Sequence, residues 1–456
     1  MAPSSRTPAP FSEPLLPQLD LPHNPYYTEK HHRLRAFVRN YVETELAPYA
    51  QEWEITGQVP ESVRLRHCQL GFAVVHPVVE PEDAGGIALP AGIPYDEWDT
   101  WCGVIVGDEL NRLGWCGPIW GLGGGNGIGC PPISRFGTRE QRQKWLPKVA
   151  RGEIRFCLGI TEPDAGSDVA NIKTTALKQG DFYLVNGAKK WITNGIWADY
   201  CTAAVRTGGP GHGGISLLVI PLRSKGVTTR RMENQGVHAS GSTYITFEDV
   251  EVPVSNLIGQ ENKGFALIMS NFNPERLALA TAALRLARVC AQDAYSYACE
   301  RETFGKPLIE HSAIKAKIAT FGLLIEPAHA FLEQLCFIIE TARKQQQSTT
   351  GAATGSVSSA SPDPINVGGM TALLKVMSTR ALERVCREAQ QIMGGAGYSK
   401  TGRGARIEQI SRDVRVHVVG GGSEEIMLDL AVRQEARDVK LRVAKKKKRG
   451  SAASKL

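Results

Sequence analysis

Residues 181–193, which read DFYLVNGAKKWIT, mark the point where the chain changes from a helical to a β pattern. This short run is rich in β-branched and aromatic residues and is divided by an Asn-Gly pair, as in strands joined by turns. Similar runs, separated by glycine and asparagine, continue from about residue 155 to residue 259. Their spacing predicts an antiparallel β-barrel or sandwich in place of alternating β–α–β units.

The regions on either side have the three- and four-residue apolar spacing of helices. Before the β-region, residues 28–54 have this spacing, and residues 138–153 begin with a threonine cap and an acidic first turn. After it, residues 275–305 and 370–395 form long helical runs that glycine ends. The sequence therefore predicts a mixed α+β fold in which a small β-domain interrupts a set of helices.

The domain boundaries follow from these changes in pattern. Residues 345–364, QQQSTTGAATGSVSSASPDP, are polar and of low complexity, so they bury too little apolar surface to fold. The predicted segments are a flexible N-terminus at 1–24, an N-terminal helical domain at 25–154, a β-domain at 155–260, a C-terminal helical domain at 261–441 with a disordered insert at 345–366, and a basic tail at 442–456.

Composition argues against several classes of protein. Hydrophobic residues make up 42% of the chain and charged residues 22%, as in an ordinary globular protein. No apolar run approaches the roughly 20 residues that span a bilayer, and the proline-rich N-terminus lacks the pattern of a signal peptide. The ten cysteines have no metal-site or disulfide spacing, so we expect reduced thiols and no metal.

Most of the positive charge lies in the tail. The chain has a net charge of +7, but residues 437–456 hold nine Lys or Arg and one Asp, so the remainder is close to neutral. Nucleic acid is therefore not an expected partner, because its binding needs basic residues along a folded surface. The last residues, Ser454, Lys455 and Leu456, form the S-K-L address that the peroxisomal import receptor binds, which predicts a peroxisomal protein.

Residues 114–130, GWCGPIWGLGGGNGIGC, are unusually rich in glycine. They contain no G-x-G-x-x-G fingerprint and follow no strand, so they do not predict a dinucleotide-binding loop. We interpret them as a site of close helix packing or as a loop near a ligand.

One candidate ligand site in the β-region is CLGITEPDAGSDVANIKTTA, residues 157–176. Thr161, Gly166 and Ser167 lie there in a strand-to-turn passage with small side chains. Backbone N–H groups in such a passage can face the oxygens or the ring edge of a ligand, although a plain β-turn has the same residues.

A second candidate is KKWITNG, residues 189–195, in which Trp191 and Thr193 point to the same face of a strand. An indole beside a hydroxyl suits stacking against a flat heterocycle. A single tryptophan is more often part of a core, so the stretch alone does not decide between the two.

Taken together, several stretches resemble the acyl-CoA dehydrogenase family. TEPDAGSDV (161–169) and KKWITNG resemble its flavin-contacting segments, and RETFGKPL (301–308) and QIMGGAGYS (391–399) resemble segments of its helical domain. RDVRVHVVGGGSEEI (412–426) resembles the signature before its last helix. The match covers roughly residues 25–440 in the family's order, and implies a C-terminal four-helix bundle.

The resemblance implies a flavoprotein in which FAD lies between the β-domain and the C-terminal helices and oxidises an acyl-CoA to the trans-2-enoyl-CoA. A homotetramer, or at least a dimer, is the assembly that it implies, since some of the FAD contacts come from a neighbouring subunit. The implied contacts are Ile160, Thr161, Gly166, Ser167, Trp191 and Thr193 within one subunit, Arg301, Phe304, Gln391 and Gly395 to the FAD of a neighbour, and Ser423 and Glu425 as the remaining contacts.

The usual position of the catalytic base is vacant. Many family members have a glutamate where this chain has Gly421. Glu424 and Glu425 are poor substitutes, because Ser423 is a good N-cap and places both in the first turn of a helix. The helix dipole and the free N–H groups stabilise a carboxylate there, which makes it a weaker base.

Isovaleryl- and long-chain-type members of the family carry the base on another helix, immediately before an arginine. This chain has NPERLALA at 273–280, so we expect Glu275 to be the base and Arg276 to shape or anchor the site. Pro274 is typical of a helix's first turn. An ordinary first-turn glutamate is the alternative.

The thioester α-carbon is too weak an acid for a carboxylate unless its carbonyl oxygen is hydrogen-bonded. The resemblance implies that the N–H of Gly421 and a ribityl hydroxyl of the flavin bind this oxygen. Burial then raises the pKa of Glu275 towards neutrality, and the β-hydrogen leaves as hydride to flavin N5. The predicted substrate contacts are Ser167, Arg276, Gly421 and Gly422.

The electron acceptor and the acyl group are open at this point. The family passes electrons to an electron-transferring flavoprotein, whereas peroxisomal enzymes of the same step commonly reduce oxygen. An acyl-CoA oxidase that makes hydrogen peroxide is therefore one alternative. A non-catalytic flavoprotein that binds DNA through its basic tail is another.

Overall fold

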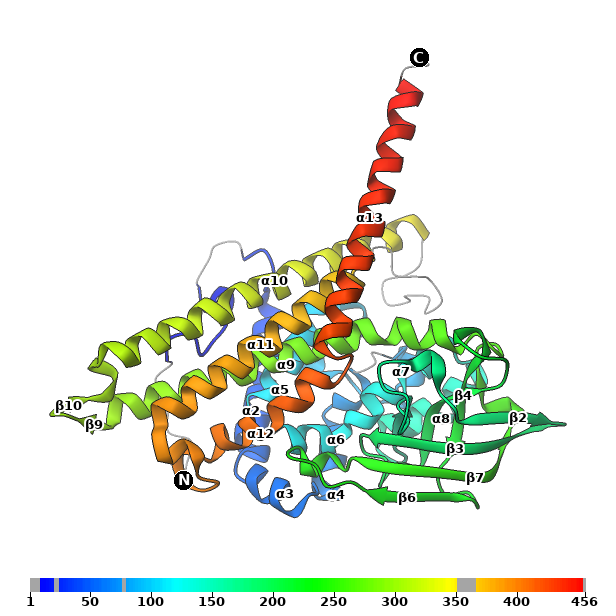
Figure 1. The fold of residues 1–456 in the computed structure, drawn as a ribbon, viewed down its shortest axis with the longest axis horizontal. Helices are drawn as coiled ribbons and strands as arrows, with labels where there is room; N and C mark the ends of the chain where they lie inside the picture. Colours follow the sequence, from blue (N-terminus) through cyan, green and yellow to red (C-terminus); the bar gives the residue numbers. More distant parts are fainter. Residues whose placement is uncertain (1–8, 20–23, 76–78, 351–365, 454–456) are drawn as a thin grey trace.

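A computed structural model describes residues 9–19, 24–75, 79–350 and 366–453 (Figure 1). The predicted import address at 454–456, and the parts of the expected N-terminus and insert at 1–8, 20–23 and 351–365, lie outside these residues. The elements follow the predicted order of helices, then strands, then helices, so the α+β fold class is confirmed.

The N-terminal helices are short, with a π-helix at Val42–Leu46 after α2 and single turns of 3₁₀-helix between α4 and α5. Two of them begin with a capping box, in which each of two side chains accepts a hydrogen bond from the backbone N–H of the other residue. The pairs are Thr28 with His31 and Thr138 with Gln141. The helices are α1 (Leu15–Gln18), α2 (Glu29–Tyr41), α3 (Ala50–Thr56), α4 (Glu61–Gln69), α5 (Thr100–Asn111), α6 (Cys116–Gly129), α7 (Pro131–Phe136) and α8 (Arg139–Ala150).

The segment before α2 is partly packed onto the molecule, so the expectation of a flexible N-terminus is wrong for residues 9–19. Arg288 donates to the carbonyls of Phe11 and Glu13 at 2.9 Å each. Arg285 donates to the carbonyl of Ser12 at 3.1 Å. These two buried guanidinium groups come from the C-terminal helices, a partner that local sequence does not reveal.

The middle region is one eight-stranded sheet with the order β6-β7-β3-β2-β4-β5-β8, and β1 pairs beside β4. Most pairs are antiparallel, but β4 runs parallel to β1 and to the start of β2, so the expectation of a purely antiparallel sheet needs this correction. The strands are β1 (Phe156–Gly159), β2 (Thr175–Gln179), β3 (Phe182–Ile192), β4 (Tyr200–Arg206), β5 (Ile215–Pro221), β6 (Val227–Arg231), β7 (Thr243–Pro253) and β8 (Leu257–Ile258).

The C-terminal region is built around α11, which packs against the other long helices. A small hairpin, β9 (Glu302–Thr303) and β10 (Lys306–Pro307), joins the first two helices at the end of the molecule away from the sheet (Figure 1). The helices are α9 (Gly264–Glu300), α10 (Ser312–Thr350), α11 (Gly368–Met393), α12 (Ala405–Val419) and α13 (Glu424–Ala453).

Two helix ends differ from the predictions. The helix α13 continues to Ala453 and projects from the body (Figure 1), so residues 442–453 extend a helix and do not form a separate flexible tail. The helix α10 continues to Thr350, which places the first residues of the expected insert at 345–366 in a helix. Lysine and glutamine are good helix formers, which is consistent with both extensions.

The third difference concerns Pro274, which lies in the interior of α9 and not in a first turn. Proline has no N–H, so the carbonyl four residues earlier loses its helical partner. That carbonyl belongs to Ser270, and Arg135 of α7 donates to it at 3.0 Å. The helix therefore passes the proline because a neighbouring side chain satisfies the free oxygen.

One of the described helices is long and apolar enough to cross a membrane, namely residues Ser312–Gln346 of α10. Charged residues interrupt its apolar ones, so it contains no continuous run of about 20 apolar residues that the sequence alone would reveal. Core helices pass the same test, and 44% of its most apolar window is buried in the fold. It packs against α9 and α11.

Candidate active site

A cavity of about 2080 Å³ lies where the three regions of the chain meet. Helices α5, α6 and α9, the β1–β2 connection, the end of β3 and the loop between α12 and α13 contribute to its wall. The predicted site residues that line it are Ile160, Thr161, Gly166, Ser167, Trp191, Thr193, Glu275, Arg276, Gly421, Gly422 and Ser423.

The β-domain wall of the cavity suits a flat ring system. Trp191 is 55% exposed and directs its indole away from the protein core. The φ of Trp191 is +65°, which is not the backbone conformation of a regular strand. The predicted alternation of side chains along a strand therefore does not explain why Trp191 and Thr193 both line the cavity. A side chain at Gly166 would meet nothing within 4 Å, which leaves this part of the wall open.

A buried ion pair behind this wall holds the connection from β1 to β2 in place. The Nζ of Lys189 lies 2.7 Å from Glu162, and both side chains are almost completely buried. Lys189 also donates to the carbonyl of Ile160 at 3.2 Å, and Glu162 accepts from the N–H of Thr174 at 3.0 Å. The sequence reasoning missed this pair, because two residues 27 positions apart carry no local signal.

Glu275 has the environment of a strong carboxylate base. Its Oε2 is buried and has no hydrogen-bond partner among the described residues. Burial raises the pKa of Glu275 to about 7, although the positive charges of Arg276 and Lys375 act in the opposite direction. A partnerless carboxyl group that faces a cavity is available to take a proton from a ligand.

Gly421 lies directly beside this carboxyl group. A Cβ placed on Gly421 would be 3.9 Å from Oε1 of Glu275, so an acid at either position reaches the same part of the cavity. The φ of Gly421 is +65°, and its Cβ would also come within 2.7 Å of Leu279. Glycine is therefore the residue that this loop conformation favours.

Two cations hold the glycine loop at residues 420–422. Arg276 donates from Nε to the carbonyl of Gly421 at 3.2 Å and from Nη1 to Asn273 at 3.2 Å. Lys375 of α11 donates to the carbonyls of Val418 and Gly422. Lys375 was not among the predicted site residues. Its signal in the sequence was a single charge within the apolar run TALLKVM.

The two glutamates after the loop face away from the cavity. Glu424 forms an ion pair with Arg380, whose hydrogen bond holds the pKa of Glu424 below its usual value. Glu425 is exposed and does not line the cavity. Both lie in the first turn of α13, as predicted, and neither has the desolvated setting of Glu275.

The glycine-rich stretch is the helix α6, not a loop. Gly121, Gly125 and Gly129 share one face, where a Cβ would collide with the carbonyls of Ala239, Phe156 and Cys157. The opposite face carries Gly123, Gly124 and Gly127, which line the cavity. A Cβ on Gly123 would meet nothing within 4 Å. The expected close packing is therefore confirmed for one face, whereas the expected loop is wrong, because the residues that border the cavity belong to a helix.

Five predicted cofactor residues lie outside the cavity, namely Glu425 and the four that were expected to contact the FAD of a neighbour. Arg301, Phe304, Gln391 and Gly395 are exposed, and Phe304 is exposed to 97%. The hairpin that carries Phe304 is at the end of the molecule far from the sheet (Figure 1). Their expected contact with the FAD of a neighbouring subunit stays a prediction.

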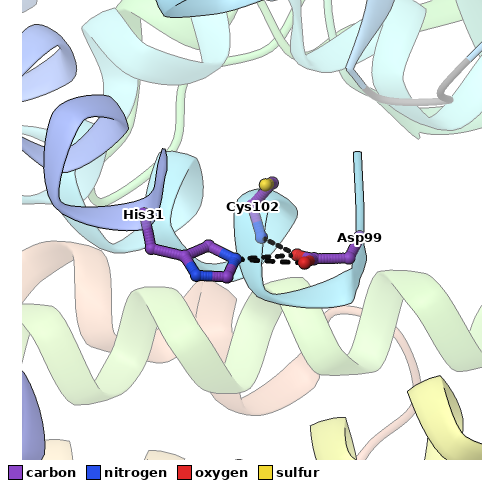
Figure 2. Close-up of side chains that lie close together, drawn as sticks. All are labelled: His31, Asp99 and Cys102. Atoms are coloured by element: carbon purple, nitrogen blue, oxygen red, sulfur yellow. Dashed lines mark hydrogen bonds and ion pairs between the residues drawn. The ribbon is translucent and has the colours of Figure 1, made fainter. Parts of the chain in front are cut away.

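A second group of potential ligand atoms, His31, Asp99 and Cys102, is shown in Figure 2. The N–H of Thr28 donates to Nδ1 of His31, so Nε2 carries the proton and donates to Asp99 at 3.1 Å. Burial raises the pKa of the Cys102 thiol to about 12. Both imidazole nitrogens are engaged, and the capping of helices α2 and α5 accounts for the arrangement of His31 and Asp99.

Comparison with known proteins agrees with this geometry. Profiles for the N-terminal, middle and C-terminal domains of acyl-CoA dehydrogenases match residues 28–153, 157–250 and 262–435. The acyl-CoA dehydrogenase AFT10-1 of Alternaria alternata is 48% identical over 94% of this chain and 96% of its own length.

Two solved structures show the same fold. An acyl-CoA dehydrogenase from Geobacillus kaustophilus has a TM-score of 0.75 at 33% identity, over 90% of this chain and 99% of that one. An acyl-CoA dehydrogenase from Bacillus anthracis in complex with FAD has a TM-score of 0.80 at 25% identity, over 94% of this chain and 71% of that one. The cavity at the junction of the domains is open and is lined by an indole. From the three domain matches, this chain belongs to the acyl-CoA dehydrogenase family and uses FAD to oxidise an acyl-CoA.

Proposed function

We propose that this protein converts an acyl-CoA to the trans-2-enoyl-CoA and that Glu275 removes the α-proton. The observation that supports this proposal is the buried, partnerless Oε2 of Glu275 beside Gly421. No hydrogen bond within the described residues occupies this oxygen, so it is free to accept a proton from carbon. A base with a pKa near 7 is also well matched to neutral pH.

The substrate carbonyl needs donors, because a thioester α-C–H is otherwise too weakly acidic. The N–H of Gly421 donates to no acceptor in the described part of the protein, and it lies in the same loop that faces Glu275. A preorganised N–H of this kind stabilises the negative charge that develops on the thioester oxygen. Bound FAD would accept the β-hydrogen as hydride.

The remaining lining residues bind and orient. Thr161, Ser167, Trp191 and Thr193 would hold the flavin against the β-domain. Arg276 is not assigned a role as an acid. It donates to the carbonyl of Gly421 and so anchors the loop. When bound ligands displace water from the cavity, the electrostatic interactions and hydrogen bonds inside it become stronger.

Anaerobic bleaching of the flavin by a panel of acyl-CoA thioesters tests the proposal. Wild-type protein should lose its yellow colour with at least one member of the panel. Glu275→Gln keeps the size of the side chain but removes the base, so flavin reduction should slow by about a thousandfold while FAD stays bound.

Glu424→Gln is the matched control, since this carboxylate is paired with Arg380 and lies outside the cavity lining. Its rate should equal that of the wild type. Near-normal reduction in Glu275→Gln would eliminate Glu275 as the base. No bleaching of wild-type protein by any acyl-CoA would eliminate the proposed reaction itself.

An acyl-CoA oxidase is the second candidate, because we also propose a peroxisomal location from the S-K-L ending. Formation of hydrogen peroxide in air, at the rate of acyl-CoA turnover, would favour the oxidase. Turnover that needs an electron-transferring flavoprotein would favour the dehydrogenase. The homotetramer is likewise proposed from the exposed hairpin and its predicted FAD contacts, and the mass of the holoprotein in solution tests it.

A further inference from the structure

Lys375 is a buried cation with an unusual set of partners. Its side chain has no exposed surface, yet it forms no ion pair with any carboxylate in the described part of the chain. A buried ammonium group without a partner is costly, so its hydrogen bonds must offset the loss of water. These bonds go to two backbone carbonyls, those of Val418 and Gly422, the second at 2.9 Å.

The first carbonyl, of Val418, precedes the glycine loop that faces Glu275, and the second belongs to the last residue of that loop. Arg276 binds a third carbonyl, that of Gly421, at 3.2 Å. A loop of glycines has many accessible conformations, and both Gly421 and Gly422 have positive φ angles. A carbonyl shares its peptide plane with the N–H of the next residue, so these bonds fix the peptide planes that hold the N–H groups of Val419, Gly422 and Ser423. The Gly420–Gly421 peptide, whose N–H belongs to Gly421, lies between these fixed planes and is oriented through them.

We propose that Lys375 is a positioning residue for α-proton removal, which holds the Gly421 N–H where it can bind the thioester oxygen, beside the Glu275 carboxyl group that takes the α-proton. This inference rests on the proposed function. Lys375 does not line the cavity. It acts through the loop, by selecting the one conformation in which the backbone donor faces the cavity.

Lys375 also acts on the base through its charge. Its positive charge lowers the pKa of Glu275, against the larger effect of burial. Removal of this charge should therefore raise the pKa of Glu275 further and leave less of the base ionised at a given pH. The charged and titratable groups around the pair, from α9, α11, α12 and α13, are Glu275, Arg276, Lys375, His417, Glu424 and Glu425.

The test compares Lys375→Met and Lys375→Gln in the FAD-loaded protein. Met removes the charge and the donors, whereas Gln retains donors for a carbonyl without the charge. With an acyl-CoA that bleaches the wild type, flavin reduction in Lys375→Met should slow by about a hundredfold or more while acyl-CoA binding is unchanged. Lys375→Gln should recover part of the rate.

The pH dependence separates a positioning role from a structural one. In both variants the acidic limb of the rate profile should move to higher pH, since both lack the charge that lowers the pKa of Glu275. Lys317→Met is the control, because Lys317 of α10 pairs with Glu388 and does not line the cavity. It should show the wild-type rate and profile.

Three results would overturn the inference. The first is a wild-type rate of flavin reduction in Lys375→Met. The second is an unshifted acidic limb in both variants. The third is a failure of both variants to load FAD when Lys317→Met loads normally, which would assign Lys375 to folding. A wild-type protein that no acyl-CoA bleaches would instead refute the proposed function.

Discussion

Single residues decide the chemistry through the space and the charge around them. Glu275 and Glu424 are both glutamates close to the glycine loop, yet their surroundings shift their pKa values in opposite directions. Burial without a partner favours the neutral acid of Glu275, whereas the hydrogen bond from Arg380 favours the carboxylate of Glu424. The better base is therefore the residue that lacks a stabilising partner.

The pH dependence of flavin reduction follows from the raised pKa of Glu275. Below about pH 7 the carboxyl group is protonated and cannot accept the α-proton, so the rate should fall as the pH decreases through this value. A stopped-flow profile of flavin reduction between pH 5 and 9 measures it. A rate that stays constant down to the normal pKa range of glutamate, about 4, would contradict the raised value.

At the scale of elements, α6 shows how one helix serves two purposes. Glycine in a helix costs roughly 0.5–1 kcal/mol per residue relative to alanine, so a helix with this many glycines needs compensation. On one face the compensation is close packing against β1 and the turn at Ala239. The other face borders the cavity through Gly123, Gly124 and Gly127, and at Gly123 a Cβ would meet nothing within 4 Å.

Gly123→Leu should narrow the range of acyl groups. The new side chain has open space in front of it and no neighbour within 4 Å of its Cβ, so it fills the cavity without a clash. Turnover of long or branched acyl-CoA should fall by about tenfold or more relative to a short straight-chain one, since a single methylene in an apolar pocket changes selectivity by 10–200-fold. The ratio of kcat/KM values measures this.

Gly213→Leu provides the control, because this glycine lies in a turn of the β-domain with open space and outside the cavity. Its ratio of kcat/KM values should equal that of the wild type. An unchanged ratio in Gly123→Leu would show that α6 does not limit the acyl group.

At the scale of the whole molecule, buried ion pairs join segments that are far apart in the chain. Arg285 of α9 binds Asp108 of α5 through Nε at 2.8 Å and the side chain of Glu13 at 3.3 Å. Asp108 also accepts from Arg35 of α2 at 2.8 Å. This network attaches the N-terminal segment and the N-terminal helices to the helix that carries Glu275.

Arg285→Met should destabilise the protein strongly. Arg285 is buried, and its loss leaves the carboxyl group of Asp108 without its main partner, which typically costs about 3–5 kcal/mol. Chemical denaturation of the FAD-loaded protein measures the change. Arg403→Met is the control, because its ion pair with Glu300 is exposed and should contribute less than about 1 kcal/mol. Equal effects of the two substitutions would contradict a structural role for the network.

Local patterns in the sequence determined the order of the helical and β-regions and the absence of an acid at Gly421, and they identified the β-domain segments that line the cavity. Periodicity and short motifs depend on neighbouring residues, so the sequence expresses them directly. The same patterns misplaced Pro274 in a first turn, because a distant side chain, Arg135, satisfies the carbonyl that the proline leaves free within the helix. They also ended the last helix too early, although its lysines are good helix formers.

Only the tertiary structure decided that Glu275 is desolvated beside Gly421, that Lys375 holds the loop, and which face of α6 is open. Each of these properties depends on the approach of segments about 30 to 150 residues apart. The physical reason is that burial, pKa and free space belong to the packed molecule, where distant segments replace water around a side chain. No local pattern contains that information.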